Sequence, residues 1–196
     1  MNSASCGGAP NVSDTFASTL WVLDFLPELS KAKVVGVNFH GGPVDLYSPV
    51  MYSTDGQLTF VSPLYIGLLA FSELVANSSR WAMAEVRKSA ALKDSFAHAA
   101  LAVQEEEGRG VCTVLRVLVI AKDGPDGGVA AAGEGVAVTV KVPASLLARP
   151  ESTATLLRLT APALASKTGL RWAGQGFGPG PPGVLSALDV SHSKYV

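Results

Sequence analysis

The sequence predicts an α/β segment over residues 1–79, followed by an all-β part, an antiparallel β-sandwich, over residues 80–196. Two observations support this division. The first part combines long apolar helical patterns with one short β-branched run, whereas the second contains several short strand patterns separated by turn residues. The pattern changes after Asn77-Ser78-Ser79, so we place the domain boundary at 79/80.

The composition indicates a chain that buries most of its residues. Hydrophobic residues make up 48% and charged residues 16%, the reverse of a disordered chain. The net charge of -1, with Lys and Arg scattered along the chain, does not favour a nucleic-acid partner. No apolar run reaches the roughly 20 residues that span a bilayer, and the first residues lack the features of a signal peptide.

The N-terminal region predicts a loop followed by an apolar helix. Residues 1–13 are rich in Gly, Ser, Asn and Pro. Ser13 is the expected N-cap, and Asp14 places a negative charge at the helix start, where it has a capping role. The helix is expected from Thr15 to Leu26, and its nearly continuous apolar surface indicates packing on more than one side. Pro27 should end or bend it.

A second group of elements completes the α/β pattern. Val34–Phe39 is a short β-branched run that predicts a strand buried on both faces. A polar loop is expected from His40 to about Gly56. Pro63 should open a second apolar helix that extends from Leu64 to about Ala76. This order is typical of an α/β barrel or a doubly wound sheet, but one strand cannot form a sheet by itself.

The second part of the chain is predicted to be a sandwich of short strands. Within it, His98 alternates like a solvent-facing strand residue, and Trp172 is interpreted as a core aromatic in preference to a sugar-stacking platform. The expected strands are Trp81–Arg87, Phe96–Val103, Val111–Ala121, Gly135–Val142, Thr155–Leu159 and Leu170–Ala173.

Two cysteines, Cys6 and Cys112, lie far apart in the sequence. They allow a disulfide, and two small buried thiols are the alternative interpretation. The chain has neither a CxxC motif nor a cluster of His with Cys, so no structural zinc site is expected.

Several spaced motifs occur in an order that is distinctive. They are Gly7-Gly8-Ala9-Pro10, Ser13-Asp14-Thr15-Phe16-Ala17, Leu20-Trp21, Leu23-Asp24, Gly36-Val37-Asn38-Phe39-His40-Gly41-Gly42, Tyr47-Ser48-Pro49, Pro63-Leu64-Tyr65 and Ala173-Gly174-Gln175. Together they resemble glycoside hydrolase family 79, the β-glucuronidases and heparanases. The resemblance is strongest over residues 1–76.

The resemblance implies a more specific architecture and chemistry. Residues 1–79 would hold the last strand and two helices of a (β/α)8 catalytic barrel, and residues 80–196 its β-sandwich C-terminal domain. Retaining glycosidases use two carboxylates about 5 Å apart, without a metal or organic cofactor. The resemblance places the acid/base Glu on an absent strand and the nucleophile immediately before Met1, which is then an internal methionine. No catalytic residue is therefore expected in this chain.

The resemblance implies that this chain contains part of a sugar-binding pocket. His40, Gly41, Gly42 and Tyr47 correspond to a loop that helps to hold the glucuronate carboxylate. Glycine N–H groups, an imidazole N–H and a phenol O–H can all donate to a carboxylate. The alternatives are that His40 caps the strand end and that Tyr47 fills the barrel mouth.

The expected function is the C-terminal portion of a retaining β-glucuronidase-like O-glycosyl hydrolase that is inactive alone. Its expected partners are a uronic-acid-containing glycan or glycoside and the N-terminal remainder of the barrel. The alternatives are a non-catalytic β-sandwich module that binds carbohydrate or another partner, and a non-functional fragment with exposed apolar helices. The intact parent is expected outside the cell or in the secretory pathway.

Overall fold

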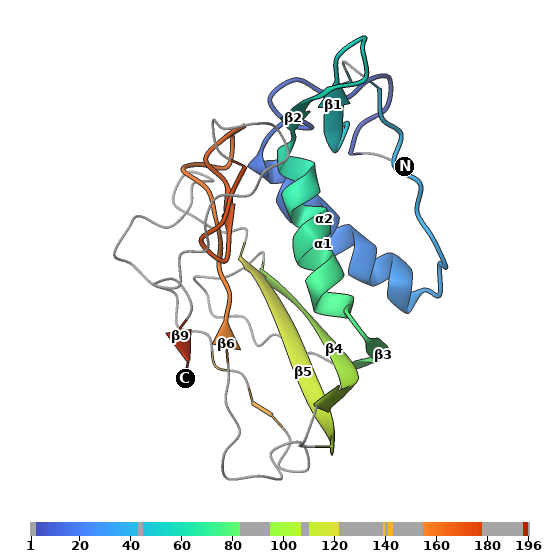
Figure 1. Cartoon of the computed structure of the whole chain (residues 1–196), viewed down its shortest axis with the longest axis vertical. Helices are drawn as coiled ribbons and strands as arrows, with labels where there is room; N and C mark the ends of the chain where they lie inside the picture. Colours follow the sequence, from blue (N-terminus) through green and yellow to red (C-terminus); the bar gives the residue numbers. More distant parts are fainter. Residues whose placement is uncertain are drawn as a thin grey trace.

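The computed structural model describes residues 3–42, 45–82, 95–106, 110–121, 139, 141–142, 155–177 and 194–195. Two helices lie side by side, with a three-stranded antiparallel sheet at one end and a small hairpin at the other (Figure 1). The elements are α1 (Phe16–Lys31), β1 (Val50–Tyr52), β2 (Leu58–Val61), α2 (Pro63–Val75), β3 (Ser78–Ala82), β4 (Ser95–Glu106), β5 (Gly110–Ala121), β6 (Thr155–Leu156), β7 (Leu159–Thr160), β8 (Arg171–Trp172) and β9 (Lys194–Tyr195).

Helix α1 starts differently from the prediction. Its N-cap is Thr15, with extended backbone and no side-chain capping bond. The first helical amides donate instead to distant carbonyls: Phe16 N to Ser166 O at 2.8 Å and Ala17 N to Leu164 O at 3.1 Å. The predicted N-cap, Ser13, is wrong because its hydroxyl accepts a bond from Ala9 N in the preceding loop. Main-chain groups from the C-terminal segment therefore satisfy the helix N-terminus.

The end of α1 also differs. The helix continues past Pro27 to Lys31, so Pro27 does not end it; the alternative expectation, that Pro27 bends the helix, stays a prediction. An internal proline removes one helical hydrogen bond and costs about 3 kcal/mol. Leu26 and Pro27 are both buried, and the apolar area that they remove from water offsets this cost.

The segment Val34–Phe39 is not a strand in the structure. Val34 and Val35 are exposed, Val35 completely, whereas Val37 and Phe39 pack against a cluster built on Val22, Leu26 and Leu64. The prediction of a strand buried on both faces is therefore wrong. An apolar run becomes a buried strand only where other strands flank it, and none of the strands in the described residues pairs with this segment.

Helix α2 follows the prediction closely. It begins with Pro63 in its first turn and ends at Val75. Proline is favoured there because its missing N–H has no helical acceptor in any case. Just before α2, strands β1 and β2 pair as a hairpin in which Val50 lies opposite Val61. This hairpin was not predicted, because its first strand lies entirely inside the expected polar loop.

The main sheet has the strand order β3-β4-β5 and is antiparallel throughout. Strands β4 and β5 confirm the predicted strands at Phe96–Val103 and Val111–Ala121, and His98 lies opposite Leu118 in their register. The prediction that His98 faces solvent is wrong: the residue is 2% exposed, because α1 covers it.

The remaining strands are short. Instead of one strand over Thr155–Leu159, β6 pairs with β9, and β7 pairs with β8. The predicted strand at Leu170–Ala173 is confirmed as β8. The predicted strand Gly135–Val142 lies largely outside the described residues, as does the end of the predicted strand at Trp81–Arg87.

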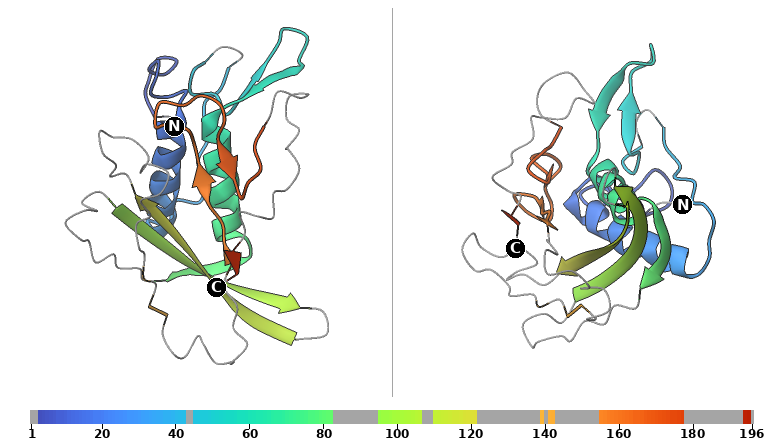
Figure 2. Two further views of the ribbon diagram at one scale, coloured as in Figure 1. Left: turned by 90° about the vertical axis from the view of Figure 1, so that its left-hand side faces the viewer. Right: turned by 60° about the horizontal axis from the view of Figure 1, so that its bottom comes forward.

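Residues 155–177 pack on the two helices (Figure 2). One cluster joins Phe16 and Ile66 to Leu170, and another joins Leu23 and Ala70 to Ile120. Both clusters combine residues from either side of the predicted boundary at 79/80. The two parts of the chain therefore share one packed interior in the region that the structure describes.

A tight turn follows β8. Trp172 and Gln175 exchange both main-chain hydrogen bonds, at 2.7 and 2.9 Å. The two residues between them, Ala173 and Gly174, have φ angles of 52° and 80°, as a type I′ turn requires. The Ala-Gly-Gln motif singled out in the sequence is therefore the turn that closes this strand.

Asp14 does not cap α1 as predicted, since no acidic residue lies in the first helical turn. Its Oδ2 atom instead lies 2.6 Å from Lys167 Nζ, and its Oδ1 atom is buried without a hydrogen-bond partner. The Asp14 side chain is 10% exposed and that of Lys167 is 47% exposed. The buried carboxylate therefore depends on a lysine that water can also solvate.

The difference in exposure between Asp14 and Lys167 leads to a prediction about stability. We expect Lys167→Met to lower the free energy of unfolding by about 2 kcal/mol, because it leaves a buried carboxylate unpaired. Asp14→Asn should cost about 1 kcal/mol, since the remaining lysine can turn into solvent. Urea denaturation of the two variants measures both values. Equal losses, or a larger loss for Asp14→Asn, would contradict this account.

Candidate functional site

The structure brings together two of the predicted sugar-binding residues. The Tyr47 hydroxyl and His40 Nδ1 share a hydrogen bond of 3.1 Å, and their rings meet edge to face with centroids 5.9 Å apart. Tyr47 is 7% exposed, whereas the His40 side chain is 74% exposed. A buried phenol thus holds an imidazole that a ligand in solution can reach.

A residue that the sequence reasoning missed completes this cluster. Asp45 Oδ2 lies 3.6 Å from His40 Nδ1, on the same side of the ring as the Tyr47 hydroxyl. The signal for it was weak: Asp45 stands two residues before Tyr47 in a loop that has no helical or strand periodicity. Its carboxylate adds a negative charge to a site proposed to bind an anion, and residues 38–48 contain no Lys or Arg.

The two glycines of the predicted site are held closely by their neighbours. A Cβ atom on Gly41 would lie 2.8 Å from Ser48 Oγ, and one on Gly42 would lie 2.8 Å from Asp45 Oδ2. Larger residues at either position would displace these side chains. The loop is also anchored from outside, since Leu46 N donates to Gly7 O at 2.9 Å. The glycines therefore allow the loop to fold tightly around Asp45 and Tyr47.

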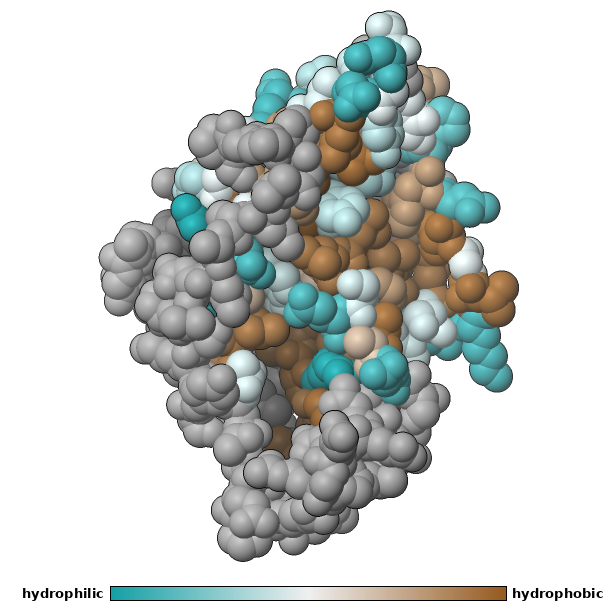
Figure 3. All heavy atoms as spheres, viewed as in Figure 1, coloured by the Kyte–Doolittle hydropathy of each residue, from teal (hydrophilic) through white to brown (hydrophobic). Residues whose placement is uncertain are grey.

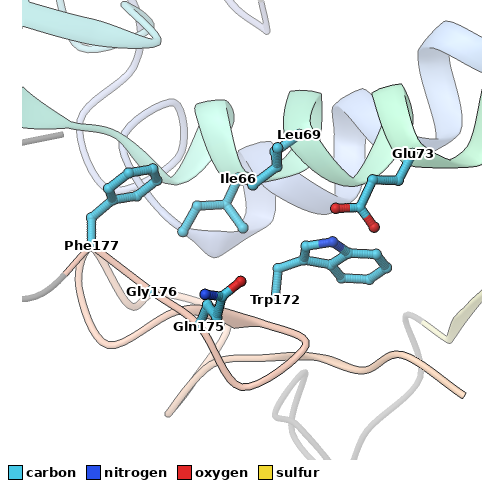
Figure 4. Close-up of a pocket in the computed structure, with 7 residues that line it drawn as sticks. All are labelled: Ile66, Leu69, Glu73, Trp172, Gln175, Gly176 and Phe177. Carbon is cyan, nitrogen blue, oxygen red and sulfur yellow. The ribbon is translucent and has the colours of Figure 1, made fainter. Parts of the chain in front are cut away.

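A small hollow lies elsewhere, between α2 and the loop after β8 (Figure 4). Its volume is about 70 Å³, well below the roughly 300 Å³ at which small-molecule sites begin. Trp172 lines it and also packs against two hydrophobic clusters, which confirms the interpretation as a core aromatic. Its buried Nε1 atom has no hydrogen-bond partner. The lining residues are Ile66, Leu69, Glu73, Trp172, Gln175, Gly176 and Phe177.

A buried polar cluster surrounds His98 on β4. Its Nε2 atom lies 3.1 Å from Asp24 Oδ1, and its Nδ1 atom lies 2.9 Å from Lys31 Nζ. Because the lysine ammonium can only donate, Nδ1 accepts and Nε2 carries the ring proton, which it donates to Asp24. Burial lowers the pKa of His98, and the hydrogen bond to Asp24 partly opposes this effect. The ring is therefore neutral in this arrangement.

Cys6 is an exposed, free cysteine, so neither the disulfide nor the buried thiol expected for this residue is observed. The expectation for the Cys112 side chain lies outside the described residues. Among the described residues, none of the groups of His, Cys, Asp and Glu side chains is arranged to hold a metal ion. Within the same residues, neither helix has the length and hydropathy needed to span a bilayer.

Comparison with known proteins adds no relative to this picture. No protein-family model matches the chain, and no curated protein matches it significantly. The assignment of function therefore depends on the motifs and on the contacts described above.

Proposed function

We propose that this chain is the C-terminal portion of a retaining β-glucuronidase-like glycoside hydrolase and contributes a loop that contacts a uronic acid. The observation that carries the proposal is the hydrogen bond between His40 and Tyr47. These residues were selected from sequence motifs as carboxylate ligands, and their side chains meet in a loop that a ligand can reach.

Exposed apolar side chains near the helices support the proposal that this chain is the C-terminal portion of a larger protein. In the segment after α1, Val34 and Val35 are exposed, whereas Val37 and Phe39 pack on the helices. Hydrophobic side chains also lie on the visible surface over α2 (Figure 3). Within α2, Tyr65 is 36% exposed. Exposed apolar surface of this kind marks an interaction site. In the proposal, the N-terminal remainder of the barrel covers it.

The proposed chemistry at the loop is binding, without catalysis. The exposed His40 ring, which the Tyr47 hydroxyl holds in place, and the amides of Gly41 and Gly42 supply donors for a carboxylate. Asp45 opposes the binding of an anion through its own charge. The proposal therefore assigns the isolated chain weak binding of a uronic acid and no hydrolysis, because the two catalytic carboxylates belong to the absent part of the barrel.

The proposal can be tested by NMR with the full chain. We expect methyl β-D-glucuronide to shift the amide signals of residues 40–42 and 45–48, with a dissociation constant of about 1 mM or weaker. Tyr47→Phe should weaken binding about threefold or more, since it removes the hydroxyl that holds the His40 ring in place. Asp45→Asn should strengthen binding by a similar factor, since it removes a charge of the same sign as the ligand.

Two controls make the test decisive. Tyr52→Phe removes the same hydroxyl from a tyrosine that is 47% exposed and lies on β1, and it should leave binding unchanged. Methyl β-D-glucoside has the same ring without the carboxylate and should cause no comparable shifts. Equal shifts with both sugars, or shifts confined to other residues, would overturn the assignment of a uronic acid site.

A further inference from the structure

The His98 cluster lies outside the proposed sugar site and connects three elements. His98 belongs to β4, while Asp24, Glu28 and Lys31 project from successive turns of α1. Lys31 Nζ also donates to Glu28 Oε1 at 2.8 Å and lies 5.9 Å from the ring centroid of Trp81 on β3. Lys31 therefore links the last turn of α1 to both neighbouring strands.

We propose that His98 is a proton-operated latch for Lys31: its neutral ring holds the end of α1 on the β3–β5 sheet through this lysine, and its protonated ring releases the lysine and binds Glu28 instead. The arrangement works only with the neutral ring, because Lys31 needs Nδ1 as an acceptor. A proton that binds Nδ1 from solvent removes this acceptor and places two positive charges about 3 Å apart.

Glu28 and Asp24 determine which contacts His98 makes after it loses Lys31. Glu28 Oε1 already lies 3.5 Å from His98 Nδ1, so this carboxylate can accept from the newly protonated nitrogen after Lys31 leaves. Asp24 keeps its bond to Nε2 in both states. The lysine then turns into solvent, and its contact with Trp81 is lost with it.

Among the side chains that the structure describes, those of the other elements around His98 supply no charge that competes with this exchange. Opposite His98 on β5 lies Leu118. The charged residue among the described side chains of β5 is Arg116, whose guanidinium donates to Ala76 O at the end of α2. Glu73 of α2 lines the hollow beside Trp172. Within the described side chains, the response to pH therefore depends on Asp24, Glu28 and Lys31.

The sign of the pH effect follows from the direction of the pKa shift. Burial holds the pKa of His98 below its usual value of 6.5 in the folded protein. The unfolded state therefore binds more protons as the pH falls below about 6.5. The stabilisation is complete above that pH and is lost as the pH decreases towards the lower folded pKa.

Hydrogen exchange of the full chain, corrected for intrinsic rates, tests the latch. Between pH 7.5 and pH 5 we expect the protection of amides in residues 31–34 to fall about threefold or more, because Lys31 no longer holds this end of the helix on the sheet. His98→Gln can keep both hydrogen bonds without titrating, so its protection should not change with pH. His40→Gln, which alters an exposed histidine in another loop, should behave like the wild type.

A second variant keeps the test meaningful if His98→Gln does not fold. Lys31→Met removes the positive charge beside the ring, so the pKa of His98, measured by NMR of the ring protons, should rise above its wild-type value. The proposal is overturned if the loss of protection persists in His98→Gln, or if His98 titrates without any change in the last turn of α1. An unchanged pKa in Lys31→Met would also reject it.

Discussion

Replacing Gly67 with valine is expected to lower the free energy of unfolding by about 3 kcal/mol. Gly67 lies within α2, on the side of that helix that faces Thr19 and Val22 of α1. A Cβ atom there would lie 2.5 Å from Val22 Cγ1 and 2.9 Å from Thr19 O. The second contact is with backbone, which cannot rotate away. The hydrogen bond from Thr19 Oγ1 to Pro63 O, at 2.7 Å, further fixes the helices at this distance.

Urea denaturation of Gly67→Val measures this effect, and Gly36→Val provides the matched control. Nothing lies within 4 Å of a Cβ atom added at Gly36, so its replacement should change stability by less than about 0.5 kcal/mol. Gly67→Ala is expected to be destabilising too, although alanine favours a helix by about 1 kcal/mol over glycine. Wild-type stability in Gly67→Val would show that the helices do not meet as described.

The second large effect is expected at Leu23. Leu23→Ala should lower the free energy of unfolding by about 3 kcal/mol, because it leaves a cavity in a packed interior. Leu23 is 1% exposed and shares a cluster with Ala70 of α2 and Ile120 of β5. It is thus a residue through which both helices contact the main sheet.

Leu157→Ala is the control for this prediction. Leu157 is 37% exposed, so the same change in volume should cost less than about 0.5 kcal/mol. Thermal unfolding followed by circular dichroism compares the two variants. If residues 1–79 and 80–196 instead behaved as independent domains, Leu23→Ala would leave the unfolding of the sheet unaffected, and two separate transitions would be observed.

The sequence predicted best those elements whose signals are local. Helix α2 carries its own start signal in Pro63, and its predicted end is within one residue of the observed one. The contact between His40 and Tyr47 is also local, since seven residues separate them. By contrast, nothing near Phe16 or Ala17 in the sequence indicates that their amides bond to residues 164–166.

Two wrong predictions have the same physical cause. Whether a residue is buried depends on packing partners that the local sequence pattern does not identify. The pattern of Val34–Phe39 predicted a buried strand, but its partners would have to come from other strands. His98 follows an alternating pattern, yet α1 covers it and supplies Asp24 as its partner, 74 residues away in the sequence. Local alternation indicates which residues share a face of a strand, not which face is covered.

The capping of α1 has a consequence for the order in which the molecule can form. The amides of Phe16 and Ala17 donate to carbonyls about 150 residues further along the chain, so these hydrogen bonds cannot form until that part has been synthesised. At ribosomal rates of 5–20 residues per second, roughly 8 to 30 s separate the synthesis of the two parts. During that time the first turn of the helix is open to water. We therefore expect a nascent chain that stops before residue 164 to show a frayed helix start, and completion of the chain to close it.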